Sequence, residues 1–95
     1  MAKGYWIARI EVEDREIYKA YVAAATPAYA RFRAKFLVRG GRCEAVEGPG
    51  RSRNVVIEFA SYERALACYN STEYRKAAAL RRKASRGEIL VVEGA

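Results

Sequence analysis

Glu58 and Arg39 are the two residues of this sequence that could together perform acid–base chemistry. A carboxylate enclosed in a mostly apolar cavity has its pKa raised by desolvation, which suits a general base. A facing arginine could hold a substrate carboxylate or stabilise an enolate. We therefore predict Glu58 and Arg39 as catalytic residues, with Arg9 beside them as a ligand-binding residue. The alternative is a salt bridge between adjacent strands that holds the sheet and performs no chemistry.

Tyrosine and arginine side chains form a second candidate group. Tyr74 and Arg81 are seven residues apart in a helical pattern, so they share one face of the helix. We predict that Tyr69 and Tyr74 form the rim of a cavity, that Arg81 reaches an anionic ligand, and that Tyr5 contributes from the first strand. The alternative is that the tyrosines pack a helix onto the sheet while Arg81 is solvated.

The elements that would carry these residues follow from the apolar pattern. Alternating apolar residues predict a strand at 5–12, and a helix follows at 14–32 with Asp14 as its N-cap and an interruption at Pro27. Further strands are expected at 35–46 and at 54–59. Gly40 and Gly41 within the first of these indicate a bulge or a close approach by another backbone or a ligand. Helical segments at 61–70 and 71–87 precede a last strand at 88–93.

This β-α-β-β-α-β order predicts an α+β, ferredoxin-like fold over residues 1–95 as a single domain. Its four-stranded antiparallel sheet would carry both helical regions on one face. The other face is expected to combine apolar side chains with ionisable ones, namely Tyr5, Ile7, Arg9, Arg39, Val56 and Glu58. A dimer that presses two such faces together would enclose a cavity with arginine and glutamate side chains pointing into it.

Charge and residue usage limit the chemistry. The formal net charge is +7 and the sequence has no His, which excludes a His-based catalytic triad and a His metal site. Basic residues gather at 31–42 and 75–86, so RNA binding needs consideration. We expect nucleic acid to be an unlikely partner, because the third strand has Val55 where an RNA-binding domain of this element order would carry a stacking ring.

Cys43 and Cys68 have no metal-binding spacing, and they are predicted to be free, partly buried thiols. The first strand contains Arg9 and Glu11, unlike the apolar region of a secretory signal. No apolar run has the roughly 18 residues of a membrane span. A cytoplasmic protein without membrane contact is therefore expected.

Several short motifs in order along the chain resemble those of the small bacterial proteins grouped as domain of unknown function 1330. They are Gly4-Tyr5-Trp6-Ile7-Ala8-Arg9, Tyr18-x-x-Tyr21, Phe36-Leu37-Val38-Arg39-Gly40-Gly41, Ile57-Glu58-Phe59-x-Ser61, Tyr69-x-Ser71-x-Glu73-Tyr74 and Val92-Glu93-Gly94. The family usually has a glycine pair where Arg33 and Ala34 stand. The resemblance implies a dimeric α+β barrel and supplies no reaction, since barrels of this kind include cofactor-free monooxygenases, isomerases and plain ligand-binding proteins.

The sequence thus predicts a homodimer that binds a small anionic organic molecule in a cavity between its paired sheets, with no metal and no cofactor. A cofactor-free oxygenase or isomerase is one form this function could take. The alternatives are a non-catalytic ligand-binding or stress-related module and an RNA-binding ferredoxin-like domain, whose affinity would fall steeply with salt.

Overall fold

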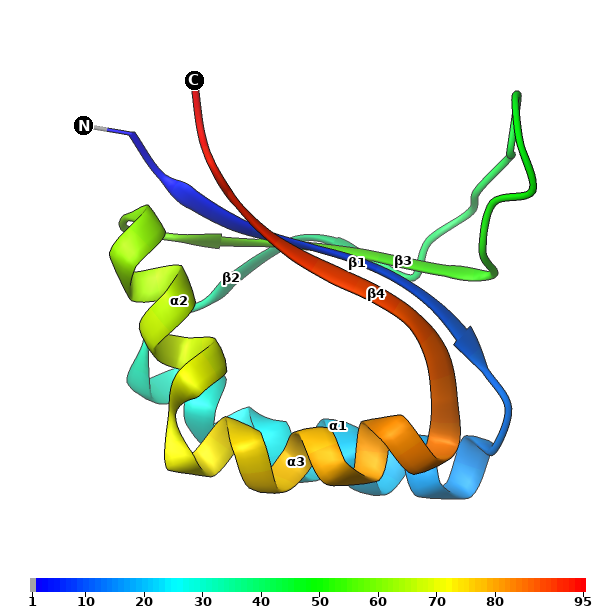
Figure 1. The fold of residues 1–95 in the computed structure, drawn as a ribbon, viewed down its shortest axis with the longest axis horizontal. Coiled ribbons are helices and arrows are strands. Elements are labelled where there is room, and N and C mark those ends of the chain that lie inside the picture. Colours follow the sequence, from blue (N-terminus) through cyan, green and yellow to red (C-terminus); the bar gives the residue numbers. More distant parts are fainter. Residues whose placement is uncertain (1) are drawn as a thin grey trace.

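The computed structural model describes residues 2–95, which form four strands and three helices in the predicted order. All the helices lie on one side of the sheet (Figure 1). None of the helices in this described part is long and apolar enough to cross a membrane. The elements are β1 (Gly4–Val12), α1 (Arg15–Arg31), β2 (Lys35–Arg39), β3 (Arg53–Phe59), α2 (Tyr62–Asn70), α3 (Thr72–Ala84) and β4 (Ser85–Glu93).

The sheet has the strand order β2-β3-β1-β4, and every neighbouring pair is antiparallel. Since side chains alternate between the two faces of a strand, one face of β1 and β3 is buried under the helices. That inner face carries Trp6, Ala8 and Ile10 from β1 and Val55, Ile57 and Phe59 from β3, all at most 7% exposed. The predicted ferredoxin-like sheet and its apolar inner face are confirmed.

The second strand is shorter than predicted, because it ends at Arg39 instead of residue 46. Gly40 has a φ of 65°, a backbone conformation that glycine adopts without strain, and its N–H bonds to the carbonyl of Asn54 at 2.9 Å. The chain therefore leaves the sheet at Gly40 and forms an extended loop up to β3. Cys43 lies in this loop and is exposed, so its predicted partial burial is wrong.

A bulge in β2 decides which way Arg39 points. The ladder pairs Phe36 with Ile57 and Val38 with Val56, so one additional residue, Leu37, is inserted on the β2 side. An extra residue moves all later side chains to the opposite face. Arg39 consequently pairs with Val55 and faces the helices, and its predicted place on the outer face is wrong.

Helix α1 begins where predicted, with the Asp14 carboxylate accepting a hydrogen bond from the Ile17 N–H at 3.1 Å. It continues through Pro27 to Arg31 instead of breaking there. Pro27 removes one backbone donor, and the carbonyl four residues earlier belongs to Ala23, which is exposed and can bond to water. The predicted interruption is therefore absent.

The end of α1 is a Schellman motif, in which the last carbonyls accept bonds from residues beyond the helix. The Ala34 N–H bonds to the Tyr29 carbonyl at 2.9 Å, and the Arg33 N–H bonds to the Ala30 carbonyl at 3.3 Å. The motif requires a left-handed residue, and Arg33 takes this role with a φ of 55°. A residue with a Cβ is strained in this conformation.

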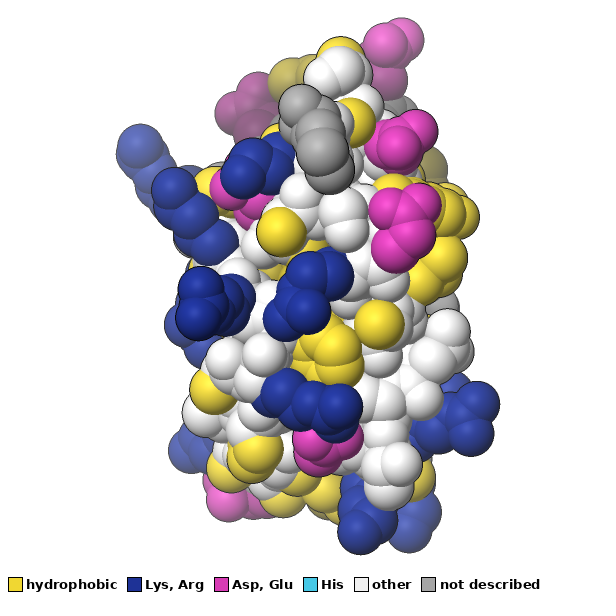
Figure 2. Space-filling model, turned by 90° about the vertical axis from the view of Figure 1, so that its left-hand side faces the viewer, with side chains coloured by type: hydrophobic (Ala, Val, Ile, Leu, Met, Phe, Trp, Pro, Cys, Tyr) yellow, Lys and Arg dark blue, Asp and Glu magenta, His cyan; other side chains and the backbone are white. Residues whose placement is uncertain are grey.

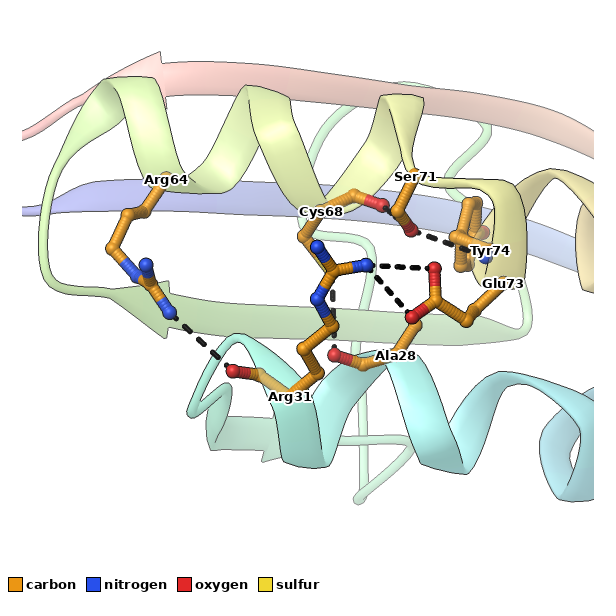
Figure 3. Close-up of polar contacts among 7 residues, drawn as sticks. All are labelled: Ala28, Arg31, Arg64, Cys68, Ser71, Glu73 and Tyr74. Atoms are coloured by element: carbon orange, nitrogen blue, oxygen red, sulfur yellow. Dashed lines mark hydrogen bonds and ion pairs between the residues drawn. The ribbon is translucent and has the colours of Figure 1, made fainter.

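Helices α1 and α3 lie side by side under the sheet (Figure 1) and are linked near one end by charged side chains. The Arg31 guanidinium bonds to both carboxylate oxygens of Glu73, at 2.8 and 3.0 Å (Figure 3). The Ser71 hydroxyl, which accepts from the Tyr74 N–H at 3.2 Å, caps the start of α3. The Arg31–Glu73 pair links α1 to α3, and the two helices carry the chain of tyrosine hydroxyls described next.

Candidate functional site

The structure does not bring the predicted catalytic pair together. Glu58 lies on the outer face of the sheet, where its carboxylate accepts a hydrogen bond from the Tyr5 hydroxyl at 3.2 Å. Arg39 lies on the inner face. Desolvation, followed by the nearby Glu58 carboxylate, raises the pKa of Tyr5. Arg9 is also on the outer face and pairs with Glu88 at 3.7 Å. The outer face therefore has Tyr5, Arg9 and Glu58 engaged with near neighbours.

Tyr74 and Arg81, by contrast, do meet as predicted. Arg81 donates a hydrogen bond from Nη1 to the Tyr74 hydroxyl at 2.6 Å. Burial acts to raise the pKa of Tyr69, but hydrogen bonding to Arg81 and its positive charge outweigh this effect, and the pKa is lowered. Tyr69 and Tyr74 therefore lie around the Arg81 guanidinium, between the helices and the inner face of the sheet.

A hollow lies beside this group, between the inner face of the sheet and helices α1 and α3. Its cavity volume is about 30 Å³, enough for roughly two waters. Apolar and aromatic side chains form most of its wall, together with three arginines. Its lining residues are Trp6, Ala8, Ile10, Tyr18, Tyr21, Val22, Tyr29, Phe36, Arg39, Arg53, Val55, Ile57, Arg81 and Ile89. We call this hollow the sheet–helix pocket.

A chain of hydroxyl groups runs along one side of the sheet–helix pocket. The Tyr21 hydroxyl lies 2.8 Å from that of Tyr74 and 3.2 Å from that of Tyr29. Desolvation is the main cause that raises the pKa of all three tyrosines far above the ordinary value, with a neighbouring tyrosine adding to it. The hydroxyls therefore keep their protons at any physiological pH and act as hydrogen-bond donors, not as bases.

The three arginines of the pocket come from different elements. Arg39 lies over the Phe36 ring at 4.0 Å, Arg53 lies beside the Tyr18 ring at 5.5 Å, and Arg81 bonds to Tyr74. Within residues 2–95, no carboxylate forms an ion pair with any of the three, and none of the lining residues is Asp or Glu. The lining therefore carries uncompensated positive charge.

Arg53 has a buried side-chain nitrogen that makes no hydrogen bond within the described chain. Its Nε is buried and has no hydrogen-bond partner among the described residues. Its guanidinium also lies against Gly40, where a Cβ would clash with Nη1. A buried guanidinium nitrogen without a partner is costly, and an anionic ligand or a water would satisfy it.

Arg53, Tyr21 and Tyr29 were not predicted as site residues. Arg53 could have been found, because it stands two residues before Val55 and therefore shares the inner face of β3. The hydroxyl chain joins α1 to α3, and nothing local in the sequence indicates that these helices are neighbours. Among the described residues, no group of three His, Cys, Asp or Glu side chains could hold a metal ion.

The outer face of the sheet carries an apolar row that crosses all four strands. Ile7 pairs with Val56 on one side and Leu90 on the other, and Val56 pairs with Val38. Leu90 is 51% exposed and Val38 is 43% exposed. The row is flanked by the polar residues Lys35, Tyr5 and Glu58 on one side and Arg9, Asn54 and Glu88 on the other. We call these four apolar residues the outer apolar row.

Basic side chains are spread over the surface more widely than the sequence runs suggest. Figure 2 shows Lys and Arg side chains standing apart among neutral ones on the face that it presents. Several of the basic residues pair with acids, as Arg86 does with Glu13 at 3.1 Å and Arg51 with Glu88 at 3.4 Å. The positive charge of Arg86 and Arg51 is therefore partly neutralised by neighbouring carboxylates.

The sequence model of the family described as domain of unknown function (DUF1330) matches residues 3–95. The chain therefore belongs to this family, as its motifs indicated. No curated protein sequence shows significant similarity to it.

Solved structures support the fold. A protein of unknown function from Rhodopseudomonas palustris, RPA0582, superposes with a TM-score of 0.74 at 16% identity, covering 97% of this chain and 80% of the other. A dimeric ferredoxin-like protein of unknown function from Thermobifida fusca superposes with a TM-score of 0.63 at 15% identity, covering 99% of this chain and 91% of the other. SnoaB, a cofactor-independent oxygenase from Streptomyces nogalater, superposes with a TM-score of 0.63 at 13% identity, covering 97% of this chain and 92% of the other. At these identities the likeness shows a shared ferredoxin-like α+β fold.

Proposed function

We propose that this member of the DUF1330 family is a homodimer that binds a small anionic organic molecule in the sheet–helix pocket of each chain. The observation that carries this proposal is a pocket of aromatic and apolar side chains into which three arginines, and no acidic residue among those described, project. Such a wall favours an apolar body bearing negative charge. The site is thus proposed inside each chain, whereas the sequence placed it between two sheets.

A ligand larger than water would need the pocket to widen. Arg39 is exposed and Arg53 is half-buried, and both lie at the β2–β3 side of the pocket. Long arginine side chains change rotamer easily at a surface, so these two can swing outward to admit a ligand. An anion would then gain charge-assisted hydrogen bonds as they return.

The outer apolar row supports a homodimer. A contiguous apolar patch on the exposed face of a sheet marks an interaction surface in most soluble proteins. A second copy of the same face would cover the row by a two-fold axis, which is the commonest symmetry of oligomers. The dimeric ferredoxin-like protein from Thermobifida fusca shares the fold.

Light scattering behind size exclusion tests the dimer. We expect a mass near twice the 10.7 kDa of the chain. Leu90→Glu should weaken the dimer by at least about tenfold, because a charge would be buried in the interface. The matched control is Val46→Glu, which places the same charge on a loop side chain that is 82% exposed. A monomer at all concentrations would contradict the proposed dimer.

Nuclear magnetic resonance with benzoate, cinnamate and naphthoate tests the pocket. We expect these acids to shift the backbone amide signals of Ala8, Ile10 and Ile89. Ala8→Leu should abolish the shifts, because Ala8 is a small residue of the pocket wall and leucine would fill the space. Ala79→Leu, at an exposed position of α3, is the matched control that should retain them. Shifts confined to outer-face residues would contradict the site.

A cofactor-free oxygenase is a second candidate, favoured by the fold that the chain shares with SnoaB. The tyrosine hydroxyls and arginines would stabilise negative charge on a substrate oxygen once the substrate loses a proton. Electrons for the reduction of O₂ would come from the substrate itself. Oxygen uptake that depends on the protein and disappears in Ala8→Leu would support this function. A bound ligand recovered unchanged in air would instead support a non-catalytic binding module.

A further inference from the structure

The sheet–helix pocket has different polar groups at its two sides. Arg39 and Arg53 come from β2 and β3, and Arg39 pairs with Val55 on the inner face. Arg81 comes from α3 and also lines a neighbouring hollow with Ser85 and Ile89 at the β4 side of the sheet. Since β2 and β4 are opposite edges of the sheet, Arg81 lies across the pocket from Arg39 and Arg53. The hydroxyl chain of Tyr74, Tyr21 and Tyr29 begins at Arg81 and ends at Tyr29, whose ring packs against Phe36 of β2.

We infer that the ligand is a planar carboxylate with a second oxygen acceptor, its carboxylate bound by Arg39 and Arg53 and its second oxygen by the tyrosine hydroxyl chain. This inference rests on the proposed function, because it specifies the molecule that the sheet–helix pocket would hold. It assigns one role to the two arginines and another to the tyrosine hydroxyls, and a separate structural observation supports each role.

The three hydroxyls of the chain carry one proton more than the hydrogen bonds among them require. Tyr21, Tyr29 and Tyr74 carry three hydroxyl protons, and the two contacts among them need only two. Arg81 can only donate, so the Tyr74 oxygen is the acceptor in that bond. Tyr74 is fully buried, and a spare proton there would stay unsatisfied, which is costly. Tyr74 therefore donates to Tyr21, and the spare proton lies on Tyr21 or Tyr29.

Tyr21 and Tyr29 both line the pocket, whereas Tyr74 does not. The spare hydroxyl proton is thus offered to the pocket, where an oxygen of the ligand can accept it. Arg81 acts here as a positioning residue, since its bond to Tyr74 fixes the direction in which the chain donates. A carbonyl or phenolate oxygen satisfies this side, and an ammonium group would not.

The arginines of β2 and β3 need an anion. The buried Nε of Arg53 has no partner among the described residues, and Arg39 has no ion pair there. Arginine binds carboxylate in a planar, two-pronged geometry. The pocket beside these donors is lined by Trp6, Phe36 and Tyr18, and their rings suit a flat apolar body.

The test compares three probes in the wild-type chain by calorimetry and by the fluorescence of Trp6, the single tryptophan. They are 4-acetylbenzoate, its uncharged amide, and 4-isopropenylbenzoate, in which a CH₂ group replaces the ketone oxygen; the 3-substituted isomers form a second set. We expect the acetylbenzoate of at least one set to bind about tenfold tighter than its amide, the ratio that one charge-assisted hydrogen bond provides. It should bind about three- to tenfold tighter than its alkene analogue, the ratio that one neutral hydrogen bond provides.

Variants test the contribution of the arginines and that of the tyrosine hydroxyls separately. Arg53→Met should remove the preference for acid over amide. The double variant Tyr21→Phe with Tyr29→Phe should remove the preference for the ketone over the alkene, because either tyrosine alone would still offer a proton to the pocket. Their matched controls, Arg75→Met on an exposed part of α3 and Tyr62→Phe at the start of α2, should keep both preferences. The probe comparison in the wild-type chain stands even where a variant does not fold.

Equal affinity for all three probes of both sets would overturn the inference and leave the proposed pocket in place. A preference for acid without one for ketone would overturn the role of the tyrosine chain. Absence of binding by every probe would overturn the proposed function together with the inference.

Discussion

Arg81 and Tyr74 lie seven residues apart on α3 and are joined by a 2.6 Å hydrogen bond from the guanidinium to the hydroxyl. The spacing is two helical turns, so the sequence alone predicts that they share a face. The structure adds that the Tyr74 hydroxyl continues to Tyr21 on α1 at 2.8 Å. One side chain on α3 is thereby connected to a second helix through a buried hydroxyl.

Arg81→Met should lower the free energy of unfolding by about 1.5–3 kcal/mol, because it removes a charged donor from the buried Tyr74 hydroxyl. Methionine retains much of the aliphatic packing, so the loss reports the hydrogen bond. Urea unfolding measures the change. Arg75→Met, at an exposed position of the same helix, should change stability by less than about 0.5 kcal/mol. Equal effects of the two changes would contradict the role of Arg81.

Alkaline pH should destabilise the fold through Tyr21, Tyr29 and Tyr74. Burial raises the pKa of each in the folded state, whereas the unfolded chain has values near the ordinary value of about 10. Their contribution to stability is therefore complete below about pH 10 and is lost as the pH rises above it. Tyr21→Phe should flatten this dependence, and Tyr62→Phe should not. Phenolate absorbance should show the three buried hydroxyls ionising only as the protein unfolds.

The two cysteines should react at very different rates. The Cys68 thiol is fully buried, its Sγ lies 3.9 Å from the Ala28 carbonyl (Figure 3), and burial raises its pKa to about 12. Cys43 is exposed in the loop after β2. Because the thiolate is the reactive form, a thiol reagent at neutral pH should label Cys43 and leave Cys68 unmodified. Cys43→Ser should remove the fast labelling, and denaturant should expose Cys68. Fast labelling of both thiols in the folded chain would contradict the buried position.

Arg33→Gly should stabilise the protein by about 0.5–1 kcal/mol, although it removes a side chain. Arg33 is held at a φ of 55° by the Schellman motif, and glycine has no Cβ to strain there. Ala30→Gly, three residues earlier at an exposed position inside α1, should instead destabilise by about 1 kcal/mol. Thermal unfolding of the two variants checks the opposite signs. Destabilisation by both would mean that the Arg33 side chain outweighs the backbone strain.

The fold could be predicted because its signals are local. Alternation along β1 and β3 places Trp6 and Ile57 on the inner face, and Asp14 and Ser71 cap helices where sequence patterns expect caps. The length of β2 was harder to predict from the sequence. It depends on Gly40 leaving the ladder, and a glycine pair in a strand is equally compatible with a bulge.

The site was harder to predict, because it depends on how elements pack. A single extra residue in β2 reverses the side on which Arg39 lies, and this separates it from Glu58. The Tyr21–Tyr74 contact depends on two helices that are distant in the sequence. Tyr74 and Arg81 were found because both lie on one helix. The sequence therefore identified the half of the site that is local.

Glu58→Gln decides between the outer face and the sheet–helix pocket as the ligand site. The Glu58 carboxylate bonds to Tyr5 on the outer face, and Arg53 lies on the inner face of the same strand. We expect Glu58→Gln to change the affinity for an aromatic acid by less than about twofold, whereas Arg53→Met should weaken it by about tenfold or more. Calorimetry with 4-acetylbenzoate measures both changes.

The control for Glu58→Gln is Glu88→Gln, which removes another carboxylate from the outer face, where Glu88 pairs with Arg9. A large loss of affinity in Glu58→Gln alone, with Arg53→Met unchanged, would move the site to the outer face, where the sequence first placed it. A loss of affinity in Arg53→Met alone would place the ligand beneath the sheet. Of Glu58 and Arg53, only Arg53 lies on the inner face, next to the helices.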